Sequence, residues 1–157
     1  MGSTVSPIPQ GFHTITPALV VKDASAAIAL YRTAFGAEEV MCLRTPTGDV
    51  MHAEMKIGDS ILMLGGEWPD HGMKAPQPGH SSASLHLYVT DVDRAFQRAV
   101  EAGCQAIFPP GNMFWGDRYA KVIDPFGHVW GLATHIEEVS PEECARRAAN
   151  WKSCDQG

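Results

Sequence analysis

The chain has 157 residues, of which 45% are hydrophobic and 19% are charged, and its formal net charge is −6. This length suits one domain with a real apolar core, since domains typically contain about 100–150 residues. The acidic balance argues against a nucleic-acid partner, which normally needs a basic surface. No apolar stretch approaches the roughly 20 residues of a membrane span, so we expect no membrane partner either.

The first residues of the chain and its cysteines indicate in which cellular compartment the protein is expected. The first residues, MGSTVSPIPQG, lack the charged and apolar regions of a signal peptide. The four cysteines form no C-x-x-C pair, and their spacings suit neither a zinc ribbon nor a disulfide scaffold; they are Cys42, Cys104, Cys144 and Cys154. Scattered thiols are typical of a reducing compartment. We therefore expect a cytoplasmic protein.

The first half of the chain predicts a strand, a helix and three further strands. An apolar strand is expected over residues 16–21, and Asp23 follows it in position to cap a helix over 24–35. Apolar side chains recur along that helix with a 3.6-residue period, and Gly36 stands where a helix favours a left-handed terminator. Turn residues separate the three strand-like runs that follow, at 36–44, 49–57 and 60–64.

The second half repeats this order after a linker. Residues 66–82 are rich in Gly and Pro, which predicts the linker. A strand is then expected over 84–89, and Asp91 precedes a helix over 92–102 that Gly103 ends. Three more strands are predicted at 105–109, 118–123 and 128–135.

Individual residues also recur at a fixed offset of 68 positions. Leu19, Val21, Asp23, Ala27, Ala34, Gly48 and Asp49 reappear as Leu87, Val89, Asp91, Ala95, Ala102, Gly116 and Asp117. We therefore predict an α+β fold of two tandem βαβββ modules, whose curved mixed sheets surround a cavity. Module one is placed at about 13–65 and module two at about 83–137, within a single domain spanning 1–139.

Residues 140–157 predict a short helical tail. Ser140 and Glu143 form a capping box, with Pro141 at the first helical position. The run CARRAANW follows and places Cys144, Ala148 and Trp151 on one face of the helix. We expect that face to pack on its own domain or on a partner subunit.

Several segments, taken in order, resemble the vicinal oxygen chelate superfamily of glyoxalases, bleomycin-resistance proteins and dioxygenases. They are TPALVVKDASAAIALYRTAFGAEE, HAEMKIGDSILML, SLHLYVTDVDRAFQRAVEAG, MFWGDRYAKVIDPFGHVWGLATH and VSPEECARR. They look like its PhnB-like, glyoxalase-like subgroup, and the resemblance runs from about residue 14 to 149. It implies that the concave faces of the sheets line the cavity while the helices cover the convex sides.

The resemblance also implies where a metal would bind. Metal-using members place His, Gln and Glu ligands on the first and last strand of each module. The matching positions here carry Thr16 and Ser84 on the first strands, Gly131 on the last strand, and Leu62 or Met63 on the fourth. None of these side chains is a reasonable ligand for a divalent ion. We therefore predict no metal and no other cofactor, and expect Thr16, Ser84 and Gly131 to line a ligand site instead.

Strand alternation predicts further ligand-binding residues. If Ser84 and Gly131 face the cavity, so do His86, Tyr88 and His135, because alternate side chains share a face. The alternative is that both histidines are satisfied by neighbouring groups.

A second group of candidates lies in FWGDRY, at the mouth of the seventh strand. Here Trp115, Arg118 and Tyr119 predict an aromatic and cationic rim that grips a planar or anionic ligand. Plain aromatic packing beside an Asp117–Arg118 turn is the alternative. We assign Trp130 to the core against the second helix.

His52 and Glu54 are catalytic candidates because they lie two residues apart on one predicted strand, where they would form an acid–base couple. A solvated strand face is the alternative.

These patterns favour a small-molecule-binding protein of the bleomycin-resistance type without a catalytic metal, which sequesters an antibiotic-like compound or a metabolite. One alternative is a metal-dependent lyase, isomerase or dioxygenase with His86, His135 and Glu54 or Glu67 as displaced ligands. Another is a metal-independent acid–base enzyme using His52 and Glu54. We also expect a homodimer, because open sheet edges are usually covered and superfamily members commonly dimerise.

Overall fold

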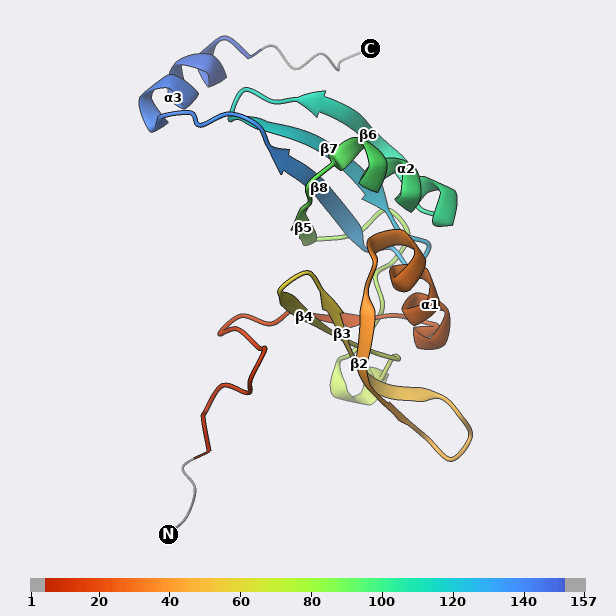
Figure 1. The fold of residues 1–157 in the computed structure, drawn as a ribbon. Helices are drawn as coiled ribbons and strands as arrows, with labels where there is room; N and C mark the ends of the chain where they lie inside the picture. The colour runs from red at the N-terminus through yellow and green to blue at the C-terminus, as the bar shows by residue number, and fades with distance from the viewer. Residues whose placement is uncertain (1–4, 152–157) are drawn as a thin grey trace. The chain divides into compact units, whose positions relative to one another are not determined.

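The computed structural model describes residues 5–151 and divides the chain into two units, the first ending at Ser81 and the second beginning at Ser82 (Figure 1). Each unit contains a four-stranded mixed sheet, with a helix between its first and second strands. The predicted α+β order, βαβββ twice, is therefore confirmed. Cys154 and the last residues of the predicted tail lie outside the described range.

Unit one contains β1 (Ala18–Val20), α1 (Ala24–Phe35), β2 (Glu38–Arg44), β3 (Val50–Ile57) and β4 (Ser60–Gly65). The strand order is β1-β4-β3-β2, with β1 parallel to β4 and the other neighbours antiparallel. Asp23 caps α1 by accepting a hydrogen bond from the N–H of Ala26, and Gly36 ends the helix at φ 67°. β1 begins later than predicted because Pro17 has no N–H to donate, although its carbonyl accepts from Met63.

One face of this sheet forms the core of unit one. The buried side chains on this face of β3 and β4 include Ala53, Met55, Leu62 and Leu64, and α1 packs against β3. The register decides between the two candidates on the fourth strand. Leu62 pairs with Met55 on the buried face, whereas Met63 pairs with Glu54 on the other face.

Unit two contains β5 (Ser84–Tyr88), α2 (Val92–Ala102), β6 (Gln105–Asn112), β7 (Asp117–Ile123) and β8 (Val129–His135). The order is β5-β8-β7-β6, with β5 parallel to β8. Asp91 caps α2 by accepting from the N–H of Arg94, and Gly103 ends the helix in a left-handed conformation. β6 runs three residues beyond its predicted end at Pro109. An edge strand tolerates this proline because its register is already shifted on either side of Phe108.

The core of unit two lies between its sheet and α2, which packs on β6, β7 and β8. Trp130 is buried in this core, as predicted, and its indole N–H donates to Asp124 at 2.9 Å. The buried apolar side chains around it on β7 and β8 are Ala120, Val122 and Leu132. α2 does not cover the opposite face of this sheet.

The predicted linker and tail both have local structure. The linker contains a short 3-10 helix, η1 (Pro69–His71), and isolated bridges at Trp68–Met73 and Gln77–His80. The tail forms α3 (Pro141–Ala149), where the Ser140 hydroxyl accepts from the N–H of Glu143. Within residues 5–151, none of the helices is long and apolar enough to cross a membrane.

Candidate functional site

Most of the predicted ligand-binding residues share one face of the unit-two sheet. His86 on β5 lies opposite Gly131 on β8, and Asp117 on β7 lies opposite His135. Because side chains alternate along a strand, this register places Ser84, His86, Tyr88, Tyr119 and His135 on the face that α2 does not cover.

Four aromatic rings form a continuous surface here. The rings of His86 and Tyr119 are stacked, with centroids 5.6 Å apart and an interplanar angle of 12°. Tyr88 lies beyond His86 at 4.9 Å, and Trp115 packs against Tyr119 edge to face at 6.0 Å. We call this surface, made of Tyr88, His86, Tyr119 and Trp115, the aromatic face.

Gly131 makes the stack between His86 and Tyr119 possible. A Cβ atom at residue 131 would lie 3.0 Å from Cε2 of Tyr119 and 3.1 Å from Nδ1 of His86. Both distances are shorter than ordinary van der Waals contact. A longer side chain at this position, such as a glutamate, would therefore have to displace the two rings.

Asp117 connects the strands beneath the aromatic face. Its side chain is only 2% exposed, and it accepts hydrogen bonds from the Trp115 indole at 3.0 Å and the Tyr88 hydroxyl at 3.1 Å. Nδ1 of His135 lies 2.8 Å from its other oxygen. Burial acts to raise the pKa of Asp117, but the hydrogen bonds from His135, Tyr88 and Trp115 outweigh it and hold that pKa below its ordinary value.

His135 is the exposed partner of this carboxylate. The hydrogen bond to Asp117, followed by the interaction with Glu138, raises the pKa of His135 above its ordinary value. Its Nε2 lies 3.3 Å from Glu138, whose own side chain is 97% exposed. A buried carboxylate that orients an accessible imidazole is an arrangement able to accept and return a proton.

The structure separates Arg118 from the residues with which it was predicted to form a rim. It points to the helix side of β7, where its guanidinium donates to both carboxylate oxygens of Asp93 at 2.7 and 2.8 Å. A third bond goes to Asn112 at 2.9 Å. The physical reason is alternation, because Arg118 lies between Asp117 and Tyr119 on the same strand. Arg118 thus fastens α2 to the sheet.

Unit one holds the other candidates. His52 and Glu54 lie on one face of β3, with Nε2 and Oε1 3.3 Å apart. This contact is longer than the one between Asp117 and His135, and neither side chain is fully buried. Thr16 precedes β1, and its hydroxyl donates to the carbonyl of His13 at 2.9 Å.

The residues at the metal-ligand positions do not fit a divalent ion. With the register known, these positions carry Thr16, Met63, Ser84 and Gly131. Glu67, one of the displaced ligands considered, accepts a hydrogen bond from the N–H of Ala75. In the part of the chain from 5 to 151, no three His, Cys, Asp or Glu side chains gather closely enough to hold a metal.

Asp117 is the residue of this site that the sequence analysis missed, whereas the alternation that gave His86 also put Tyr88 on this face. Asp117 was considered only as part of a turn, although it lies two residues before Tyr119 and therefore shares its face. That spacing was the available signal. The burial of Asp117 depends on Tyr88 and His135, which are 29 and 18 residues away, so no local pattern announces it.

Comparisons with known proteins identify the family of this chain. A family model described as the Glyoxalase/Bleomycin resistance protein/Dioxygenase superfamily matches residues 11–132. An uncharacterized protein of Mycobacterium bovis is 41% identical over 133 residues, covering 82% of this chain and 88% of the relative.

Solved structures show the same fold. The crystal structure of TioX from Micromonospora sp. ML1 has a TM-score of 0.64 and 25% identity, covering 79% of this chain and 99% of that one. A glyoxalase-related enzyme from Fulvimarina pelagi has a TM-score of 0.62 and 25% identity, covering 78% and 87% of the two chains.

Proposed function

The chain belongs to the Glyoxalase/Bleomycin resistance protein/Dioxygenase superfamily, and on this basis we propose that it binds a small molecule on the aromatic face without a catalytic metal. The observation that carries the proposal is Gly131. Metal-using members carry a ligand at this position, whereas here the rings of His86 and Tyr119 fill the space that such a side chain would need.

The ligand that suits this surface is planar. Stacked and edge-on rings bind flat conjugated molecules through dispersion and the ring quadrupole. His135 and Ser84 lie on the same face and provide polar groups for orientation. Arg118, already paired with Asp93, provides no charge here. We infer a planar aromatic compound, either antibiotic-like or a metabolite, which the protein sequesters in the cytoplasm.

We further propose that the protein is a homodimer. In each unit the sheet has open edges, and β2 presents the exposed side chains of Val40 and Leu43 at one of them. Open apolar edges are usually covered. Light scattering at micromolar concentration should therefore give twice the chain mass; a particle of 17.0 kDa contradicts the dimer.

An acid–base enzyme is a second candidate, and the contact between Asp117 and His135 favours it. The imidazole of His135 is oriented by a buried carboxylate and lies on the same face as the aromatic rings. His52 and Glu54 remain the alternative couple. Turnover that is lost in His135→Gln but retained in His52→Ala would support this candidate and assign it to unit two.

The test of the binding proposal compares two aromatic residues. A panel of planar probes (coumarin, acridine and 5-methoxyindole) is screened by thermal shift and then titrated by calorimetry. Tyr119→Leu should weaken any probe about fivefold or more, since a stacked aromatic pair contributes about 1 kcal/mol beyond its buried area.

Trp68→Leu is the matched control, because Trp68 is an exposed aromatic of unit one that lies outside the aromatic face. The Trp68→Leu variant should bind every probe with the affinity of the wild type. Binding that depends on Trp68, or on His52 and Glu54, and that ignores Tyr119 would place the ligand elsewhere and contradict the proposal.

A further inference from the structure

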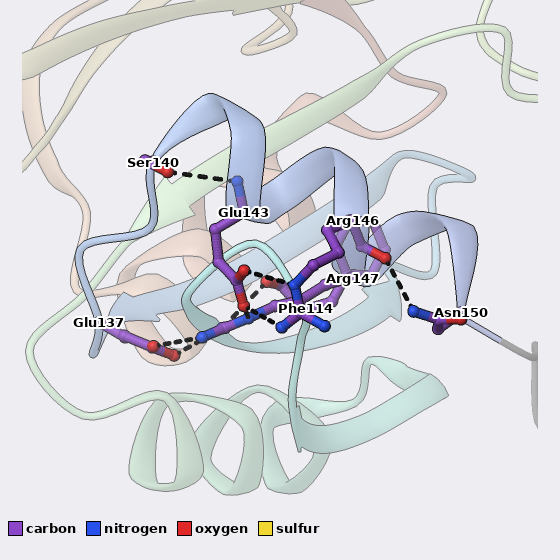
Figure 2. Close-up of polar contacts among 7 residues, drawn as sticks. All are labelled: Phe114, Glu137, Ser140, Glu143, Arg146, Arg147 and Asn150. Atoms are coloured by element: carbon purple, nitrogen blue, oxygen red, sulfur yellow. Dashed lines mark hydrogen bonds and ion pairs between the residues drawn. The ribbon is translucent and has the colours of Figure 1, made fainter.

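Arg147 of α3 joins three segments of unit two (Figure 2). Its guanidinium donates to both carboxylate oxygens of Glu137, which follows β8, at 2.7 and 2.9 Å. It donates to Glu143 within α3 at 2.7 Å, and to the backbone carbonyl of Phe114, in the turn between β6 and β7, at 3.4 Å. One side chain thus links the helix to the turn that carries Trp115.

A series of ring contacts runs from α3 to the aromatic face. The ring of Trp151, just after α3, lies 5.2 Å from that of Phe114. Phe114 in turn meets Trp115 edge to face, with centroids 5.1 Å apart and planes at 88°. Trp115 donates to Asp117 and packs against Tyr119. Trp115 therefore packs on Phe114, whose ring also contacts Trp151.

The backbone of this turn is held independently of α3. The carbonyl of Gly116 accepts from the N–H groups of both Ile136 and Glu137 at 3.0 Å, and the N–H of Met113 donates to the backbone carbonyl of Asp117 at 2.7 Å. Arg147 of α3 adds contact with the carbonyl of Phe114, and Trp151, just after α3, adds contact with its ring. Loss of that contact should change how the two rings are placed and leave the sheet intact.

Arg147 forms its ion pairs in contact with water. The side chains of Arg147, Glu137 and Glu143 are all partly exposed, so solvent screens the attraction between their charges. The network of four hydrogen bonds nevertheless restricts the geometry of the groups that it joins.

We propose that Arg147 is a positioning residue for the aromatic face: it holds the Phe114–Trp115 turn in the orientation that presents Trp115 to the ligand. Helix α3 then helps to form the binding surface, although none of its own residues belongs to the aromatic face. The consequence for ligand affinity rests on the proposed function, whereas the placement of Trp115 does not.

Arg146 provides a matched control within the same helix. It donates to both oxygens of Glu143, at 2.7 and 2.6 Å, and receives a bond at its carbonyl from Asn150. Unlike Arg147, it makes none of the described contacts with Phe114 or Glu137. Arg146→Met and Arg147→Met both remove an ion pair with Glu143, but only Arg147→Met releases the turn.

The experiment follows the indole N–H signal of Trp115 by nitrogen–proton NMR, assigned through Trp115→Phe. In Arg147→Met this signal should shift or broaden, and 5-methoxyindole should bind about fivefold more weakly, the effect expected for one misplaced aromatic contact. Arg147→Lys, which keeps the charge but not the planar fork, should lie between Arg147→Met and the wild type. Arg146→Met should match the wild type in both measurements.

Circular dichroism and thermal melting show whether α3 remains folded in each variant. An unchanged Trp115 signal in Arg147→Met, or an equal change in Arg146→Met, would overturn the inference. A Trp115 signal that moves while probe affinity stays constant supports the positioning contact and contradicts the proposed function. The two ideas therefore fail separately.

Discussion

The carboxylate of Asp117 and the imidazole of His135 face each other on the neighbouring strands β7 and β8, with 2.8 Å between Oδ1 and Nδ1. One partner is buried and the other is accessible. The carboxylate can only accept, so the imidazole donates from Nδ1, while Nε2 faces the exposed carboxylate of Glu138.

The first prediction is that this pair stabilises the fold within a defined pH window. The pKa of His135 is raised on folding, so its contribution is fully present below about pH 6.5 and is lost as pH rises through the folded value. The pKa of Asp117 is lowered, so its contribution is present above about pH 4 and is lost as pH falls through the folded value.

The difference in unfolding free energy between the wild type and His135→Gln should therefore be largest near pH 5–6, measured by urea titration at several pH values. NMR titration should give His135 a pKa above 6.5, which Asp117→Asn lowers. A His135 pKa that is the same in both proteins would contradict the described pair.

The second prediction concerns Gly116, which has φ 101° and stands against the backbone carbonyl of Glu137. A Cβ there would overlap that oxygen, so Gly116→Ala combines a left-handed strain with a steric clash. We expect a loss of about 3 kcal/mol or more in unfolding free energy, measured by denaturant titration.

Gly48 is its counterpart 68 residues earlier and serves as the control. Its φ is 94°, close to that of Gly116, but nothing lies within 4 Å of its Cβ position. Gly48→Ala should therefore cost only about 1–2 kcal/mol, the backbone strain alone. Equal losses in the two variants would show that the contact with Glu137 contributes nothing.

The third prediction concerns Gly131. Gly131→Ala places a Cβ at 3.0–3.1 Å from Tyr119 and His86, so one of the rings must move by a few tenths of an ångström. We expect a loss of about 1 kcal/mol in stability, a change in the near-UV circular dichroism of the aromatic groups, and weaker binding of planar probes.

Gly111→Ala is the appropriate comparison for Gly131→Ala, because its Cβ would make only ordinary van der Waals contacts, the shortest of them 3.5 Å to the terminal methyl of Met113. It should leave the aromatic spectrum unchanged. If Gly131→Ala also leaves the spectrum and the affinities unchanged, the stack between His86 and Tyr119 is not part of the binding surface.

The fourth prediction concerns the helix caps. Asp91→Ala removes the acceptor for the N–H of Arg94 at the start of α2 and should cost about 1 kcal/mol by thermal or chemical denaturation. Asp91→Ser keeps an oxygen that can accept this bond and should recover most of the loss. Equal destabilisation by the two substitutions would show that the cap does not depend on this hydrogen bond.

The local signals of the sequence determined the elements of this protein. Both major helices span the predicted residues, 24–35 and 92–102, because an N-cap and a left-handed terminator act within one helical turn of the groups they satisfy. The repeat order and the burial of Trp130 were predictable for the same reason, since an apolar period is readable wherever one face is buried.

Only the tertiary structure decided which polar side chains meet. In unit one, the strand register placed Met63, and not Leu62, on the face opposite the buried one. In unit two, alternation turned Arg118 toward Asp93, 25 residues away. The buried position of Asp117 depends on partners from β5 and β8. The sequence of a strand shows which residues share a face. Pairing between distant segments then decides which other side chains each face contacts.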